Sequence, residues 1–121
     1  MAKKILVVDD EPDLLKAVVF RLKKSGYDII EATDGQKAMD LVQEDRPHLI
    51  LLDLRLPIID GWEVCRRIKG DEELKNIPII ILTASAGAIN SETTRELMAE
   101  DLLVKPFEPD LLLEKIRKYI G

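Results

Sequence analysis

Five side chains that could hold a metal ion and a phosphoryl group follow short aliphatic segments of the chain. Asp9 and Asp10 follow the first segment, Asp53 the third, Thr83 the fourth and Lys105 the fifth. If these segments are parallel strands, their carboxyl ends meet at one edge of a sheet, which is where ligands bind in open α/β folds. The sequence therefore predicts one small acidic pocket.

The three carboxylates of this pocket require cations. At about 4 Å, two carboxylates repel each other by about 4 kcal/mol at an effective dielectric constant near 20. Lys105 supplies one positive charge, and a divalent ion supplies the two others that balance Asp9, Asp10 and Asp53. Because the ligands are all hard oxygen atoms, Mg2+ is favoured over zinc or copper.

A phosphoryl group on Asp53 would add about two negative charges to the pocket. The metal ion and Lys105 would neutralise these charges and orient the group for in-line transfer. Thr83 would donate its hydroxyl to a phosphoryl oxygen. The residue types at these positions therefore fit phosphoryl transfer to a carboxylate.

The spacing of apolar residues predicts an α/β fold that positions this pocket. Short aliphatic runs alternate with helical patterns, which is typical of a parallel sheet with helices on both faces. Three of the runs are apolar throughout, as strands buried on both faces should be. The expected strands are residues 5–8, 28–32, 49–52, 77–82 and 102–104.

Five helices are expected between and after these strands. They begin at Pro12, Asp34–Gly35, Asp60, about residue 90, and Pro109. Proline is suited to the first helical position, and Asp60 with Glu63 forms a capping-box pattern. The fourth helix, about residues 90–98, is rich in Ser, Thr and Asn, so we expect it to be the least stable element.

Composition indicates one globular domain, residues 1–121, in the cytoplasm. The 18 Lys and Arg against 23 Asp and Glu give a net charge of -5 without a basic cluster, which argues against direct binding of nucleic acid or of an anionic membrane. The single cysteine, Cys65, excludes an internal disulfide. The first apolar run has four residues, Ile5–Val8, far fewer than a signal peptide or a membrane span needs.

Four segments of the chain resemble the receiver domains of bacterial and archaeal response regulators. They are Ile5–Pro12, Leu51–Gly61, Thr83–Ala84 and Lys105–Phe107. The spacings are also similar to those of the family: 43 residues from Asp10 to Asp53, 30 from there to Thr83, and 22 from there to Lys105. The resemblance implies a flavodoxin-like, doubly wound (βα)5 sandwich whose five parallel strands have the order 2-1-3-4-5.

The resemblance also implies roles for the residues of the pocket. Asp53 would accept a phosphoryl group from a sensor histidine kinase or a histidine phosphotransfer protein. Mg2+ would be bound by Asp10, Asp53 and the backbone carbonyl of Arg55, with Asp9 acting directly or through water. Lys105 would contact the phosphoryl group, and the peptide bond that follows it is expected to be cis.

The family signals to a downstream effector protein through the surface formed by the fourth helix, the fifth strand and the fifth helix. Such a domain is a phosphoacceptor switch rather than an enzyme, and we expect a monomer or a weak, phosphorylation-dependent dimer. The family sets the lifetime of the phosphoryl group largely at two positions, here Arg55 and Ser85. Leu102 replaces the usual switch aromatic, so we expect the conformational change to be concentrated before the fourth helix. Met98 stands where the family usually has a glycine after that helix, which leaves the position of the helix end open.

Three other interpretations share part of this pattern. A flavodoxin-like electron carrier needs a hydroxyl- and glycine-rich phosphate loop after the first strand, where Asp9–Glu11 would repel phosphate. A haloacid-dehalogenase-type phosphatase needs a second Asp two residues after its nucleophile, where this chain has Arg55. The third interpretation is a receiver that forms part of a longer regulator or hybrid kinase.

Overall fold

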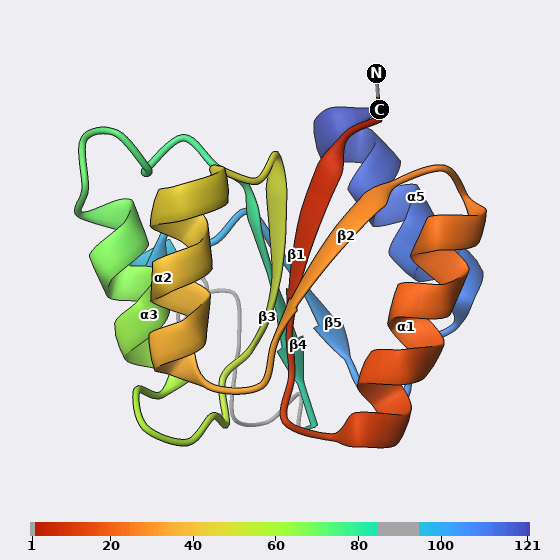
Figure 1. The fold of residues 1–121 in the computed structure, drawn as a ribbon, viewed down its shortest axis with the longest axis horizontal. Helices are drawn as coiled ribbons and strands as arrows, with labels where there is room; N and C mark the ends of the chain where they lie inside the picture. Colours follow the sequence, from red (N-terminus) through yellow and green to blue (C-terminus); the bar gives the residue numbers. More distant parts are fainter. Residues whose placement is uncertain (1, 85–94) are drawn as a thin grey trace.

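The computed structural model describes residues 2–84 and 95–121, which form a five-stranded parallel sheet flanked by helices (Figure 1). The strands are β1 (Lys4–Val8), β2 (Asp28–Ala32), β3 (Leu49–Asp53), β4 (Ile79–Thr83) and β5 (Asp101–Val104). Their order is β2-β1-β3-β4-β5, and each neighbouring pair is parallel. The predicted fold class and strand order are confirmed.

Helices cover both faces of the sheet (Figure 1). The helices α1 (Pro12–Lys24) and α5 (Pro109–Ile120) lie on one face, and α2 (Gly35–Asp45) and α3 (Gly61–Lys69) lie on the other. Each face has its own apolar core, in which alternate residues of the strands pack against the helices. All five residues of β3 are buried, as a central strand covered on both sides requires.

The predicted helix starts are confirmed where the structure describes them. Asp34 caps α2 by accepting a hydrogen bond from the backbone N–H of Lys37 at 2.7 Å, and Asp60 caps α3 by accepting one from Glu63 at 2.9 Å. The carboxylate of Glu63 does not complete a capping box but pairs with Arg66 and Arg67 in the next turn, which holds its pKa below the usual range. Half of the predicted capping box is therefore present.

The expected strand ranges differ from the structure by one residue at one end of β1, β3 and β5, and most at the start of β4. The strand β4 begins at Ile79 rather than at residue 77, because Pro78 has no N–H to donate to a neighbouring strand. Residues 95–97 are helical and end at Met98, whose φ of 61° is the left-handed conformation that favours glycine. Residues 90–94 of the predicted fourth helix lie outside the described residues.

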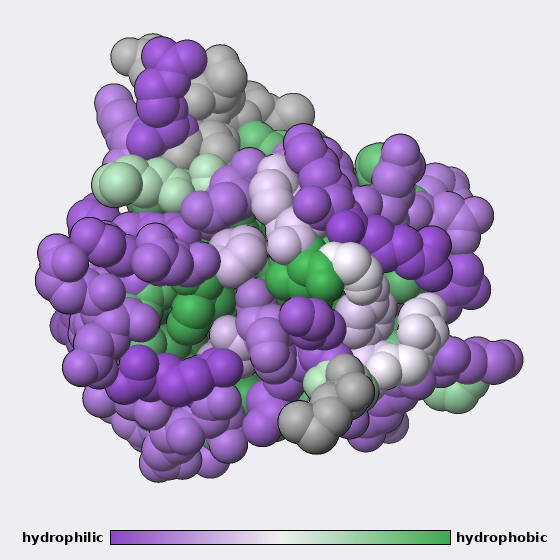
Figure 2. Space-filling view, turned by 90° about the horizontal axis from the view of Figure 1, so that it is seen from above, coloured by the Kyte–Doolittle hydropathy of each residue, from purple (hydrophilic) through white to green (hydrophobic). Residues whose placement is uncertain are grey.

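The exterior is largely polar. Figure 2 shows a face of the molecule on which hydrophilic residues predominate and apolar residues appear in small patches. Among residues 2–84 and 95–121, no helix has the length and the apolar character needed to cross a bilayer.

Ile58, in the loop between β3 and α3, has an unfavourable backbone conformation. Its φ is 71°, and 78% of its surface is exposed. A β-branched residue in the left-handed region costs about 1–2 kcal/mol. Because the side chain of Ile58 is mostly exposed, its burial contributes little free energy to offset this cost.

We therefore predict that Ile58→Gly raises the free energy of unfolding by about 0.5–1 kcal/mol, because glycine tolerates positive φ but gains entropy in the unfolded chain. Urea denaturation should show a higher midpoint. Ile58→Ala, which keeps a Cβ at the same φ, is the control and should leave the midpoint almost unchanged. A lower midpoint for the glycine variant would contradict the assignment of strain.

Candidate functional site

The register of the sheet brings the predicted residues to one edge. Val8 pairs with Leu52 of β3, so Asp9 follows directly beside Asp53. On the other side, Asp53 is paired with Leu82, the residue before Thr83. Thr83 is paired with Val104, which precedes Lys105. The carboxyl ends of β1, β3, β4 and β5 therefore converge, as the sequence predicted.

The carboxylates of Asp9, Asp10 and Asp53 form one cluster. Each can offer an oxygen so that the three oxygens lie within 4.8 Å of one another. Asp9 and Asp53 are buried, whereas Asp10 is exposed. Their loops hold the two buried carboxylates by backbone hydrogen bonds of 2.9 Å, from Glu11 N–H to Asp9 and from Arg55 N–H to Asp53.

Lys105 enters this cluster from the end of β5. Its Nζ lies 2.8 Å from Oδ2 of Asp9, 2.9 Å from Oδ2 of Asp53 and 3.1 Å from Oε1 of Glu11. Burial disfavours the charged ammonium, but these three carboxylates outweigh burial and raise the pKa of Lys105. The bond between Lys105 and Pro106 is cis, as predicted.

Glu11 was not predicted as part of this site. Its carboxylate pairs with Lys105, although its side chain is mostly exposed. In the sequence it was named only as part of the acidic segment Asp9–Glu11, which would repel a phosphate loop, and not as a partner of Lys105. Its position directly after Asp9–Asp10 could have indicated that it belongs to the site, because the residues that follow the end of a strand lie at the same edge of the sheet.

The loop between β3 and α3 folds back onto Asp53 through Gly61. The N–H of Gly61 donates to the carbonyl of Leu54 at 3.0 Å. A Cβ at Gly61 would lie 2.2 Å from the backbone oxygen of Asp53 and 2.5 Å from Cα of Leu54. Only glycine fits this approach, so the start of α3 is fixed against the strand end that presents Asp53.

The cluster fits a divalent cation. With all four groups ionised, Asp9, Asp10, Asp53 and Lys105 carry a net charge of -2. Oδ2 of Asp9 is fully buried and, within residues 2–84 and 95–121, has no polar partner besides Lys105. Burial, opposed by Lys105 and reinforced by Asp53, raises the pKa of Asp9, so a cation nearby would favour its ionised form. Oxygen ligands of this kind match Mg2+.

Three of the four other predicted residues belong to the described part of the chain. Thr83 is buried as the last residue of β4. The side chain of Arg55 is exposed, and its backbone N–H faces Asp53. Leu102 is half-buried and packs with the core on the α2 and α3 face. Ser85 lies outside the described residues.

Cys65 of α3 is a core residue. It is fully buried, and its thiol donates a hydrogen bond to the carbonyl of Leu97 at 3.4 Å. Burial raises the pKa of Cys65 to about 11, so the reactive thiolate is suppressed at neutral pH.

Comparison with known proteins gives one consistent result. Residues 5–117 match the response regulator receiver domain family. The receiver domain of a sensor histidine kinase from Pseudomonas aeruginosa PAO1, solved with a magnesium ion in its active-site cleft, superposes with a TM-score of 0.91 at 32% identity, covering 100% of this chain and 99% of that one.

Two further structures are similar over nearly the whole chain. For the chemotaxis response regulator CheY4 of Vibrio cholerae the TM-score is 0.89 at 29% identity, with 99% of this chain and 100% of that chain covered. A CheY-like receiver domain protein from Methanospirillum hungatei JF-1 gives 0.88 at 27% identity, with coverage of 98% and 93%.

Proposed function

This chain belongs to the response regulator receiver domains of two-component signalling, and on that premise we propose that it is a phosphorylation switch whose acceptor is Asp53. The observation that supports this most strongly is the contact of Lys105 with both Asp9 and Asp53, at 2.8 and 2.9 Å, in a buried carboxylate cluster. If Lys105 served only to stabilise the fold, one carboxylate partner would be sufficient. The additional acidic groups suit a site that also holds a cation.

The residues of the site have distinct proposed roles. Asp53 attacks the donor's phosphorus through a carboxylate oxygen while the bond from phosphorus to the donor's histidine nitrogen breaks and the imidazole leaves. Arg55 N–H holds the other carboxylate oxygen of Asp53 in place. Lys105 binds the phosphoryl oxygens as a fixed positive charge, and Thr83 donates its hydroxyl to one of them. Mg2+, held by Asp10, Asp53 and the backbone carbonyl of Arg55 with Asp9 in support, would supply the remaining two positive charges.

The proposed partners are those that this chemistry requires. A sensor histidine kinase or a histidine phosphotransfer protein donates the phosphoryl group, and a downstream effector protein reads the result. The chain catalyses only its own phosphorylation and dephosphorylation, works in the cytoplasm, and binds neither nucleic acid nor membrane directly. It is a monomer or a weak phosphorylation-dependent dimer.

The proposed output surface consists of the predicted fourth helix, β5 and α5. Only part of this route is described, because the segment that links Thr83 to it, residues 85–94, lies outside the described residues. Leu102 supplies no aromatic ring to reorient when the phosphoryl group arrives. We propose that the change is therefore concentrated before the fourth helix.

The metal site can be tested by Asp10→Ala. Wild-type protein titrated with Mg2+ should show a change in the fluorescence of Trp62, which is half-buried in the first turn of α3. Asp10→Ala should abolish this change and also slow phosphorylation by acetyl phosphate, because it removes an exposed metal ligand without opening the core. Asp13→Ala, in the first turn of α1, is the matched control. A titration of Asp10→Ala equal to that of wild type would refute the ligand assignment.

The lifetime of the phosphoryl group can be tested by Arg55→Asn. A long cation can lie over the phosphoryl oxygens and hinder the attacking water, whereas asparagine can hydrogen-bond that water. We expect phosphate to be lost about tenfold faster, equivalent to about 1.4 kcal/mol of barrier. Decay of the phosphorylated protein should be followed with and without the substitution. An unchanged or slower decay would show that Arg55 points away from the site.

A further inference from the structure

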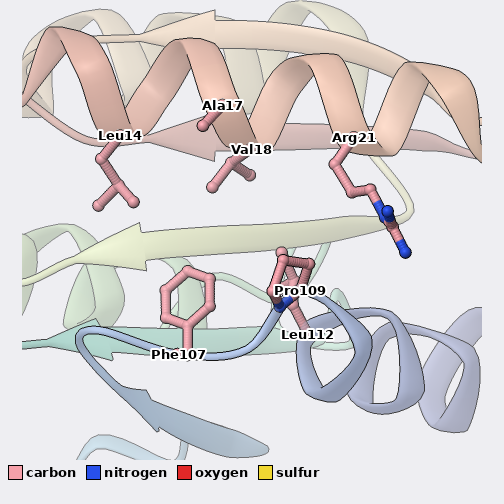
Figure 3. Close-up of a pocket in the computed structure, with 7 residues that line it drawn as sticks. All are labelled: Leu14, Ala17, Val18, Arg21, Phe107, Pro109 and Leu112. Atoms are coloured by element: carbon pink, nitrogen blue, oxygen red, sulfur yellow. The ribbon is translucent and has the colours of Figure 1, made fainter.

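A cavity lies between α1 and α5, lined by residues that do not belong to the carboxylate cluster (Figure 3). Its volume is about 110 Å3. Its walls are aliphatic and aromatic side chains from α1, from the loop after β5 and from the start of α5: Leu14, Ala17, Val18, Phe107, Pro109 and Leu112. An engineered cavity of about 150 Å3 with similar lining accepts benzene, so this space is suited to a small ring.

Among the lining residues that belong to the described part of the chain, Arg21 alone is charged. Figure 3 shows its side chain extending from α1 at one end of the cavity, beyond the apolar walls. The guanidinium pairs with Asp110 at 3.0 Å, but their side chains are 45% and 92% exposed. An ion pair this exposed contributes little, so Arg21 can exchange it for an anionic ligand.

From this combination we infer that the cavity between α1 and α5 is a binding site for a small aromatic carboxylate. The ring lies between α1 and Phe107, where offset stacking on an aromatic side chain is favourable. The carboxylate lies at the open end and accepts hydrogen bonds from Arg21, whose planar guanidinium suits that group. A neutral ligand of the same shape would gain only the apolar part of this interaction.

The position of the cavity relates it to the phosphorylation site without overlapping it. Phe107 is two residues after Lys105, and Leu14 is three residues after Glu11. The ligand would therefore contact the two chain segments that follow the ends of β1 and β5. The walls of the cavity contain none of the carboxylates of the cluster and not its lysine. Binding of the ligand can therefore be measured on protein that is not phosphorylated.

The probe for the test is phenylacetate, with phenylacetamide as the neutral analogue of the same shape. Addition of phenylacetate to the full chain should shift the NMR signals of Leu14, Ala17, Val18 and Phe107, with a Kd of roughly a millimolar for a ligand of this size. Arg21→Gln should weaken phenylacetate binding about fivefold, the upper range for an exposed ion pair. Phenylacetamide binding should be unchanged by that substitution.

Three further variants separate the apolar part of the binding energy from the charged part. Ala17→Leu fills the cavity from an exposed helix position and should abolish binding of both probes, whereas Lys16→Leu adds the same side chain outside the cavity and should not. Asp110→Asn removes the competitor for Arg21 and should strengthen phenylacetate binding. The inference would be overturned if phenylacetate shifted the NMR signals of residues elsewhere in the chain. It would also be overturned if Ala17→Leu bound the probes as tightly as wild type, or if Arg21→Gln had no effect on phenylacetate binding.

Discussion

Replacing Asp53 by Asn is expected to abolish phosphorylation by acetyl phosphate in the presence of Mg2+. Asparagine has the shape of aspartate and can still accept the hydrogen bond from Arg55 N–H, so the fold and the loop are preserved. Its amide oxygen carries no full charge and does not attack phosphorus at a useful rate. We expect a loss of roughly a hundredfold or more, equivalent to at least about 2.7 kcal/mol of barrier.

Intact mass spectrometry after incubation with acetyl phosphate measures this directly. Wild-type protein should gain one phosphoryl group, and Asp53→Asn none. Asp40→Asn, on the exposed side of α2, is the matched control and should behave as wild type. Phosphorylation of Asp53→Asn at the wild-type rate would place the acceptor elsewhere.

The second large effect is expected at the opposite end of the sheet, where Lys69 is buried. Only 4% of its side chain is exposed. Its Nζ donates three hydrogen bonds of 2.9–3.0 Å, to the carbonyls of Lys75 and Ile77 and to Oε2 of Glu100. The other oxygen of Glu100 accepts from Ile79 N–H at 2.7 Å. One ammonium therefore ties the end of α3 to the segments that lead into β4 and β5.

Lys69→Met is expected to lower the free energy of unfolding by about 3 kcal/mol. The apolar side chain fills the space but leaves a carboxylate and two carbonyls without their donor, and breaking a buried pair from one side costs about 3–5 kcal/mol. For a domain of this size the melting temperature should fall by about 10 °C.

Lys75→Met serves as the control for this substitution. Its pair with Glu72 is exposed, so the stability should change by less than about 0.5 kcal/mol. In a double-mutant cycle, Lys69→Met combined with Glu100→Gln should cost less than the sum of the two. Equal stability of the Lys69 and Lys75 variants would show that the three hydrogen bonds are replaced by water.

The sequence was sufficient to predict the fold and the location of the site because both follow local patterns. Aliphatic runs identified the strands, and polar residues at their carboxyl ends identified the pocket. The parallel order of the sheet then brought Asp9, Asp53 and Lys105 together. The resemblance to the receiver family added the strand order and the cis bond before Pro106, both of which the structure contains.

The features that the sequence did not predict depend on tertiary contacts. A lysine near the end of an amphipathic helix, such as Lys69, is usually solvated, and nothing local shows that a distant Glu100 lies within reach. The positive φ of Ile58 likewise belongs to a tight turn, in which Ile59 N–H donates to the carbonyl of Pro57 at 2.9 Å. Glu11 joins the site only because Lys105 extends from a strand 94 residues later.

The central claim, that Asp53 is the phosphoacceptor, is tested most directly by locating the modified residue. Protein treated with acetyl phosphate and Mg2+ should be reduced with borohydride, which converts an aspartyl phosphate to homoserine and releases the phosphate. Peptide sequencing by mass spectrometry should then find homoserine at position 53, and none when Mg2+ is removed with EDTA. Homoserine at another aspartate, or unmodified Asp53 in protein that has gained a phosphoryl group, would contradict the account.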